Sequence, residues 1–242
     1  MIISLKSGIM KKFLLLLLIA VIPVFAHDVY SPDNFKYKDS GENLLFVVDF
    51  SNSMSDYIGN SKKTDMVKAV LNRILPKIPS NTNAGLRVYG HTCNPIAFNA
   101  CRSSELIVPM KQDNSLNISS ALSKLRPRGM TPITYSLKQA VKKDFDNTKG
   151  KKHIILLTDG GENCDESPCE YAISLVKTRR DINIDVIAFD VKDSDDLEQL
   201  KCTADVTGGH FVKADTNANL IHSMNELLLP HMEVEALIWY EK

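Results

Sequence analysis

The most constraining feature of the chain is a run of five apolar residues, 44–48, that leads directly into polar side chains at alternate positions. An uninterrupted apolar run of this length indicates a strand buried on both faces, as in parallel sheets covered by helices. Asp49, Ser51 and Ser53 follow the run, and all three carry oxygen donors that do not suit a hydrophobic core. Carboxylates and hydroxyls grouped at the end of such a strand predict a site for a hard cation.

A second strand of the same kind covers residues 153–158 and ends in Asp159. Further strands are predicted at 84–90, 104–109, 184–189 and 210–213, and helices at 66–75, 115–125, 133–143, 168–179, 195–206 and 218–229. This alternation predicts an α/β fold with a doubly wound, mostly parallel central sheet and helices on both faces. Ligands bind beyond the carboxyl ends of the strands in such sheets, and Asp49 and Asp159 are expected there.

The two ends of the chain are expected to lie outside this domain. Residues 1–26 predict a cleaved signal peptide, because Lys11 and Lys12 precede a short apolar run and Ala26 completes a cleavage site. An uncleaved N-terminal anchor is the alternative. Residues 27–42 form a polar lead-in, residues 43–229 the domain and residues 230–242 a C-terminal tail. Pro230 is expected to end the last helix, and residues 234–239 have the composition of one more strand.

The charge balance argues against some classes of partner. Basic and acidic residues number 29 each, and the loss of Lys6, Lys11 and Lys12 with the signal peptide leaves a formal charge of −3. Nothing in this balance favours nucleic acid or a polybasic membrane contact. We therefore expect a periplasmic or secreted protein without stable membrane insertion after cleavage.

The five cysteines fit an oxidising compartment. Sequence proximity favours the local pairs Cys93 with Cys101 and Cys164 with Cys169. The main alternative joins Cys202 to one of the latter two, because sequence alone does not determine pairing. A zinc site is not expected, since the spacing of two cysteines typical of zinc ligands is absent.

A third oxygen donor, Thr131, lies in a Gly-Met-Thr-Pro loop before a predicted helix. Asp49, Ser51 and Ser53, then Thr131, then Asp159 with its following glycine resemble, in order and context, the metal-ion-dependent adhesion site of von Willebrand factor type A domains. The resemblance covers about residues 43–229. Residues 87–91, 129–133 and 158–160 are similar to those of exported bacterial members of that family.

The resemblance implies a binding function. Ser51 and Ser53 would bind Mg²⁺ (or Mn²⁺ or Ca²⁺) through their hydroxyls, Thr131 directly or through water, and Asp49 and Asp159 largely through water. With few carboxylates in direct contact, the ion would accept an Asp or Glu carboxylate from another molecule. The resemblance thus implies an exported, metal-dependent protein-binding module whose partner supplies an acidic side chain.

Two other classes of function remain open. A scaffold or assembly subunit of an envelope complex would have a structural or vestigial metal site. A metal-dependent hydrolase would need a base or a nucleophile in addition. We expect no enzyme, because the scattered histidines assemble no Ser/His/Asp arrangement and no nucleophile-elbow motif occurs. Taken singly, each motif also has a plain structural explanation as a turn, a cap or a helix start.

Overall fold

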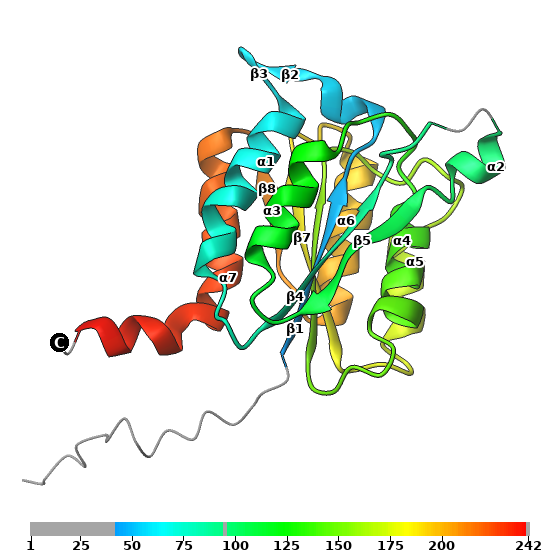
Figure 1. Cartoon of the computed structure of the whole chain (residues 1–242). Helices are drawn as coiled ribbons and strands as arrows, with labels where there is room; N and C mark the ends of the chain where they lie inside the picture. The colour runs from blue at the N-terminus through cyan, green and yellow to red at the C-terminus, as the bar shows by residue number, and fades with distance from the viewer. Residues whose placement is uncertain (1–41, 94–95, 241–242) are drawn as a thin grey trace, which may run out of the picture. The chain divides into compact units, whose positions relative to one another are not determined.

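The computed structural model describes residues 42–93 and 96–240 (Figure 1). The predicted signal peptide and residues 27–41 of the lead-in lie outside these ranges. The core of the fold is a six-stranded sheet with the order β5-β4-β1-β6-β7-β8, in which only the edge strand β5 is antiparallel to its neighbour. The strands are β1 (Asn43–Asp49), β4 (Asn83–Tyr89), β5 (Ser104–Lys111), β6 (Lys152–Thr158), β7 (Ile182–Phe189) and β8 (Phe211–Ala214). The predicted α/β architecture is confirmed.

Helices cover both faces of the sheet, as expected for a doubly wound fold (Figure 1). One face packs against α1 (Lys63–Ile74), α3 (Ser115–Lys124) and α7 (Asn217–Tyr240). The other packs against α4 (Ile133–Gln139), α5 (Pro168–Leu175) and α6 (Ser194–Thr207). Strand β1 lies between these layers: Phe46 and Val48 belong to the first hydrophobic cluster, and Leu45 and Val47 to the second. The apolar run is therefore buried on both faces, as its composition predicts.

The register of the central strands brings the two acid-ended strands to the same edge. Asp49 pairs with Tyr89 of β4, and Val48 pairs with Leu157 of β6. Because these three strands are parallel, the residues that follow them emerge together beyond one edge of the sheet. Asp159, which follows β6 directly, thus lies next to the segment that begins at Asp49.

Several short elements complete the fold. The segment after β1 forms a 3₁₀ turn, η2 (Asn52–Ser55), and a hairpin of β2 (Tyr57–Ile58) and β3 (Ser61–Lys62), where the sequence indicates a loop. Helix α1 ends in the 3₁₀ turn η3 (Leu75–Lys77), and α2 (Ala97–Ala100) lies between β4 and β5. Helix α4 continues into a π-helical turn, η4 (Ala140–Asp144), which ends one residue beyond the predicted end of that helix.

The prediction that the last helix ends at Pro230 is wrong. Helix α7 continues through Pro230 to Tyr240, so no strand forms at 234–239. Proline removes one hydrogen bond and crowds the preceding turn, which bends a helix without necessarily ending it. In Figure 1 the red helix changes direction before its end. Within the described ranges, no helix combines the length and apolar character needed to cross a membrane.

The preferred disulfide pairing is also wrong. The structure joins Cys101 to Cys164 and Cys169 to Cys202, while Cys93 is free and exposed. The alternative that places Cys202 with one of the 164/169 pair is correct for Cys169. Both bonds join segments far apart in sequence, one of them between α5 and α6, which pack together. Proximity in the sequence is a poor guide here because the fold, not the local chain, sets the distance between cysteines.

Candidate metal centre

Asp49 begins the site at the end of β1, and its side chain is fully buried. The backbone N–H of Ser51 donates to Oδ1 of Asp49 at 2.6 Å, and the Thr158 hydroxyl donates to Oδ2 at 2.8 Å. The carboxylate is therefore held from both sides, by its own turn and by the last residue of the neighbouring strand. These contacts orient Asp49 toward the segment that carries the two serines.

The serines connect the first loop to the third. The hydroxyl oxygens of Ser51 and Ser53 lie 3.1 Å apart, and the Ser53 hydroxyl donates to Oδ1 of Asp159 at 2.7 Å. Ser51 and Asp159 are buried, and Ser53 is partly exposed. Four of the five predicted ligands thus form one contiguous group, although they come from segments about a hundred residues apart in the sequence.

The second loop reaches the site through its backbone. Ser51 pairs with Gly129 in an isolated parallel bridge, and the N–H of Asn52 donates to the Gly129 carbonyl at 3.0 Å. Thr131 follows two residues later and is buried. The structure therefore brings all three predicted loops to one edge of the sheet, with the side chains of the first and third in direct contact.

A glycine makes this close approach possible. Gly90, just after β4, has φ 69°, and a Cβ atom there would lie 2.6 Å from the Ser51 nitrogen and 2.7 Å from the Met130 carbonyl oxygen. The Gly90 carbonyl also accepts from the N–H of Gly129 at 2.7 Å. Any larger residue at this position would push the first and second loops apart.

Two residues that follow Asp159 hold the Thr131 loop in place. Oδ1 of Asn163 accepts from the Thr131 N–H at 2.7 Å, and Oε2 of Glu162 accepts from the Thr134 N–H at 2.7 Å in the first turn of α4. From the sequence, Glu162 lies close enough to Asp159 to support the site but is expected to be solvated, and Asn163 is not predicted at all. The available signal is that Pro132, the N-cap residue of α4, has no side chain that can accept a hydrogen bond, so an acceptor must come from elsewhere.

A buried lysine next to the site, Lys63, is also not predicted from the sequence. Nζ of Lys63, in the first turn of α1, lies 3.0 Å from Oδ2 of Asp159 and 3.2 Å from Oδ2 of Asp190. Lys63 is buried, whereas a lysine at the start of a helix is usually solvated. Asp190 follows β7 at the same sheet edge. Lys63 therefore supplies the positive charge nearest to the predicted ligands.

The two ligand carboxylates favour a cation electrostatically. Burial, together with the negative charge of Asp159, raises the pKa of Asp49 from its ordinary value of 3.8 to about 7. Burial also raises the pKa of Asp159, although its hydrogen bond from Ser53 and the charge of Lys63 oppose this. Both shifts indicate that the negative charges of Asp49 and Asp159 are not fully balanced by neighbouring groups, because two buried carboxylates at short range repel each other. A divalent cation would relieve that repulsion.

The donor set fits a hard divalent cation. Its members are three hydroxyls and two carboxylates, which are oxygen donors of the kind that Mg²⁺, Mn²⁺ and Ca²⁺ prefer. In residues 42–93 and 96–240, no group of three or more His, Cys, Asp or Glu side chains is arranged to hold a metal. This site differs from such groups because serine and threonine supply more than half of its donors.

Comparison with known proteins places this geometry in a family. The chain is 29% identical to the uncharacterized protein YwmD of Bacillus subtilis (strain 168) over 214 residues, which cover 86% of this chain and 92% of YwmD. Its fold is similar to that of the conserved hypothetical protein BatB from Bacteroides thetaiotaomicron, with a TM-score of 0.61, 15% identity and coverage of 79% of this chain and 98% of BatB.

A second solved structure is similar and holds a metal. It is proximal thread matrix protein 1 from the mussel byssus with a zinc-occupied MIDAS motif, the metal-ion-dependent adhesion site. The TM-score is 0.60 and the identity 21%, over 77% of this chain and 44% of that one. At such identities the likeness shows the fold alone. The family model for the von Willebrand factor type A domain, however, matches residues 43–227, and the chain therefore belongs to the von Willebrand factor type A domain family.

Proposed function

We propose that the protein is an exported module that binds a protein partner through a divalent metal ion, and that the partner supplies an Asp or Glu side chain. The observation that supports this most strongly is the contiguous group of hydroxyls and carboxylates formed by Ser51, Ser53 and Asp159, with Asp49 held behind it. Thr131, from the second loop, completes the proposed ligand set. The metal is Mg²⁺ in this proposal, with Mn²⁺ or Ca²⁺ as substitutes.

The roles of the residues in this proposal are those that the family resemblance implies. The hydroxyls of Ser51, Ser53 and Thr131 contribute no negative charge, and Asp49 and Asp159 would act largely through water. The ion supplies a Lewis-acidic position that remains attractive to one further carboxylate. Lys63 and Ser53 hold the Asp159 carboxylate in a single orientation. With the metal bound, the site would suit recognition of an acidic residue.

We propose no catalytic activity. The two serine hydroxyls contact each other and a carboxylate. In the part of the chain that the structure describes, the histidines pair with acids outside the proposed ligand set: His91 with Glu105, His153 and His210 with Asp185, and His222 with Glu226. These pairs do not favour a Ser/His/Asp arrangement at the site. Domains of this family commonly mediate protein interactions. Export is supported by the pattern of residues 1–26 and by two disulfides, which persist in oxidising compartments.

The first experiment tests metal binding by thermal unfolding. Mg²⁺ or Mn²⁺ should raise the melting temperature of the wild type above its value in EDTA, because a ligand that binds only the folded state stabilises it. Asp159→Ala should lose this rise. Asp195→Ala, at an exposed position in the first turn of α6, is the matched control and should keep it. A wild type that does not respond to either metal would contradict the proposal.

The second experiment tests what the metal is for. A crosslinking pull-down from the exported fraction, with and without chelator, should yield a partner that the chelator releases. A partner retained equally in chelator would favour a scaffold or assembly subunit of an envelope complex. Turnover of a hydrolase substrate that disappears in Asp49→Ala would show an enzyme and overturn the non-catalytic proposal.

A further inference from the structure

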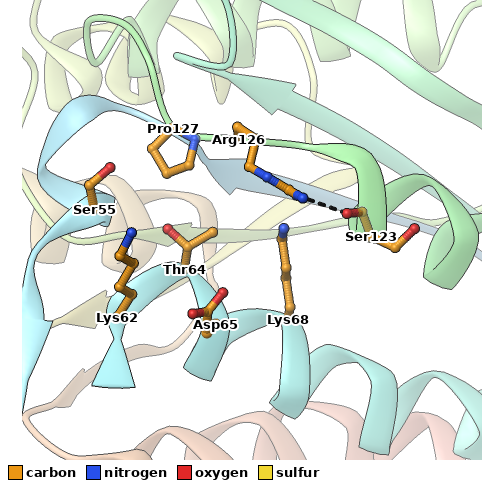
Figure 2. Close-up of a pocket in the computed structure, with 8 residues that line it drawn as sticks. All are labelled: Ser55, Lys62, Thr64, Asp65, Lys68, Ser123, Arg126 and Pro127. Atoms are coloured by element: carbon orange, nitrogen blue, oxygen red, sulfur yellow. Dashed lines mark hydrogen bonds between the residues drawn. The ribbon is translucent and has the colours of Figure 1, made fainter. Parts of the chain in front are cut away.

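A pocket of about 400 Å³ lies between the start of α1 and the loop that follows α3 (Figure 2). Its lining comes from three segments, which contribute Ser55 at the end of η2; Lys62, Thr64, Asp65 and Lys68 around the start of α1; and Ser123, Arg126 and Pro127. In Figure 2 the side chains of Lys62, at the end of β3, and Lys68, in α1, point toward the wall that carries Pro127 and Arg126. No part of the proposed metal centre lines this pocket.

The pocket nevertheless shares its walls with the metal centre. Ser55 is two residues beyond Ser53, and the Thr64 hydroxyl donates to the Met54 carbonyl between them. Lys63, whose ammonium group contacts Asp159, lies between the pocket residues Lys62 and Thr64. The loop that carries Ser51 and Ser53 therefore continues from the metal centre into the pocket. Residues that line the pocket are thus one or two positions along the chain from residues of the metal centre.

The second shared wall is the loop that leads to Thr131. Pro127 lines the pocket, and the N–H of the next residue, Arg128, donates to the carbonyl oxygens of Phe50 and Gly90. Phe50 directly precedes Ser51, and Gly90 lies against Ser51. These hydrogen bonds connect the backbone beside the pocket to the backbone of the metal centre. The pocket and the metal centre are therefore adjacent.

The charge of the pocket is strongly biased. Lys62, Lys68 and Arg126 line it, against a single acid, Asp65. Within the described ranges, none of the three cations forms an ion pair with a carboxylate. Burial lowers the pKa of Lys68, and the positive charge of Arg126 lowers it further. The charge of Asp65 offsets part of this repulsion, and three cations facing one acid leave an excess of positive charge that a bound anion would compensate.

A purely structural role explains part of this cluster. Nζ of Lys68 donates to the Leu125 carbonyl, and Nη1 of Arg126 donates to the carbonyls of Ser123 and Leu125, so both cations satisfy the C-terminal end of α3. Lys62 has no such role: its ammonium group lies 5.7 Å from the centroid of the Tyr57 ring, on the other wall. The Nε and Nη2 groups of Arg126 also remain as donors, because arginine offers five in total.

We infer that this pocket takes a second acidic side chain of the same partner. The partner is accordingly an acidic peptide segment with two carboxylates close together, one bound at the metal centre and one between Lys62, Lys68 and Arg126. The inference rests on the proposed function of the neighbouring site. Once one carboxylate is held at the metal centre, the second binds at a high effective concentration, so a modest contact adds substantially to affinity. This favours a two-carboxylate peptide over a free anion.

The test uses fluorescently labelled Gly/Ser peptides and the purified protein in Mg²⁺. One series carries two glutamates separated by one, two or three glycines, and its matched series has the second glutamate replaced by glutamine. Fluorescence anisotropy should show that one of the two-glutamate peptides binds the wild type about tenfold more tightly than its partner. The double variant Lys62→Met/Arg126→Met should reduce this advantage to less than about twofold, with the affinity of the one-glutamate peptide unchanged.

Charge loss elsewhere is the matched control. Lys111→Met/Lys124→Met removes two exposed positive charges outside the pocket and should retain the advantage. The inference is overturned if no two-glutamate peptide binds the wild type better than its partner, including the case in which neither binds. It is also overturned if the pocket variant keeps the advantage, or if the control variant loses as much of it.

A metal-free arm separates this inference from the proposed function. Inorganic phosphate titrated in EDTA should shift the backbone amide signals of Ser55, Thr64 and Asp65 in the wild type and not in Lys62→Met/Arg126→Met. If those shifts occur while one-glutamate binding is insensitive to EDTA, the pocket binds anions and the metal-dependent function is wrong. If phosphate shifts the signals but the second glutamate adds nothing, the pocket is a site for a free anion and the two-carboxylate partner is wrong.

Discussion

The ammonium group of Lys63 lies 3.0 Å from one oxygen of Asp159, while the other oxygen of that carboxylate accepts a hydrogen bond from Ser53 at 2.7 Å. One carboxylate thus joins a buried cation to the proposed metal ligands. Lys63 also contacts Asp190, so it bridges the ends of β6 and β7. In the absence of metal, Lys63 is the group that compensates the charge of Asp159.

Removal of Lys63 should therefore have opposite effects on stability and metal affinity. Lys63→Met leaves the buried Asp159 carboxylate without its cation, and we expect the metal-free protein to lose about 3 kcal/mol of unfolding free energy. Mg²⁺ should bind more tightly, by about tenfold, because a neighbouring positive charge no longer opposes it. Thermal unfolding in EDTA and calorimetric titration with Mg²⁺ measure the two effects.

The control for this prediction is Lys192→Met. Lys192 also pairs with Asp190, but its side chain is 70% exposed and does not contact Asp159. Its removal should change stability by less than about 1 kcal/mol, as for an exposed ion pair. Equal effects of Lys63→Met and Lys192→Met would contradict a special role for Lys63.

The metal-free protein should lose stability as the pH rises toward and beyond 7. Burial and the charge of Asp159 raise the pKa of Asp49 to about 7 in the folded state, above its ordinary value of 3.8. The folded state therefore binds more protons than the unfolded state between these values, and stability falls as the pH increases through that window. Melting temperatures in EDTA should be higher at pH 5.5 than at pH 8.

Two comparisons isolate the contribution of Asp49. Saturating Mg²⁺ should flatten the pH dependence, because the cation compensates the charged form. Asp49→Asn, which has nearly the same shape and no charge, should flatten it in EDTA as well. An EDTA profile that is the same in Asp49→Asn and the wild type would show that Asp49 is not the group responsible.

Asn163 should act on metal binding through Thr131. Its side chain accepts from the Thr131 N–H, so Asn163→Ala should release the second loop and weaken Mg²⁺ binding by about tenfold, with about 1–2 kcal/mol lost from the unfolding free energy. Asn163→Asp keeps an acceptor oxygen at this position and should restore most of the affinity. Equal loss in both variants would mean that the hydrogen bond to Thr131 is not what matters.

The two disulfides should differ in their effect on the metal centre. Cys164 lies in the same loop as Glu162 and Asn163, and its backbone N–H donates to Oε1 of Glu162 at 3.0 Å. Cys101→Ser/Cys164→Ser should therefore lower both the melting temperature and the Mg²⁺ affinity. Cys169→Ser/Cys202→Ser removes a link between α5 and α6. It should reduce the unfolding free energy by about 2–4 kcal/mol, and with it the melting temperature, and leave the Mg²⁺ affinity unchanged.

Peptide mapping under non-reducing conditions checks the pairing on which this prediction depends. It should recover Cys101 joined to Cys164 and Cys169 joined to Cys202, with Cys93 free to react with a thiol reagent. Recovery of Cys93 joined to Cys101 would contradict the structure. Loss of Mg²⁺ affinity in both double variants alike would contradict a selective link between the first disulfide and the site.

Much of the fold and the proposed site could be predicted from local patterns. The apolar run before Asp49 predicts a strand buried on both faces, and two such strands in a parallel sheet must place Asp49 and Asp159 at one edge. Thr131 was identified from its resemblance to a family motif, and the structure brings its loop to Ser51 through the bridge at Gly129. The strand predictions succeed because burial follows from the uninterrupted apolar runs, and strand direction from the alternation of strands and helices, both of which the sequence shows directly.

Other features could not be predicted in this way. Lys63 has the appearance of an ordinary lysine at a helix start, and Asn163 that of a loop residue, until the fold places an acid or a backbone N–H beside them. The predicted end of the last helix is wrong because α7 continues beyond Pro230, and a proline bends a helix without necessarily ending it.

By itself, the sequence determined which oxygen donors the chain offers, the α/β architecture that carries them and the sheet edge where they lie, because these depend on residue type and periodicity along the chain. Only the tertiary structure decided which cation compensates Asp159, which side chains hold Thr131, how the cysteines pair and where three cations line a pocket beside the metal centre. Each of these is a contact between segments remote in sequence, and its distance is set by how helices and loops pack on the sheet.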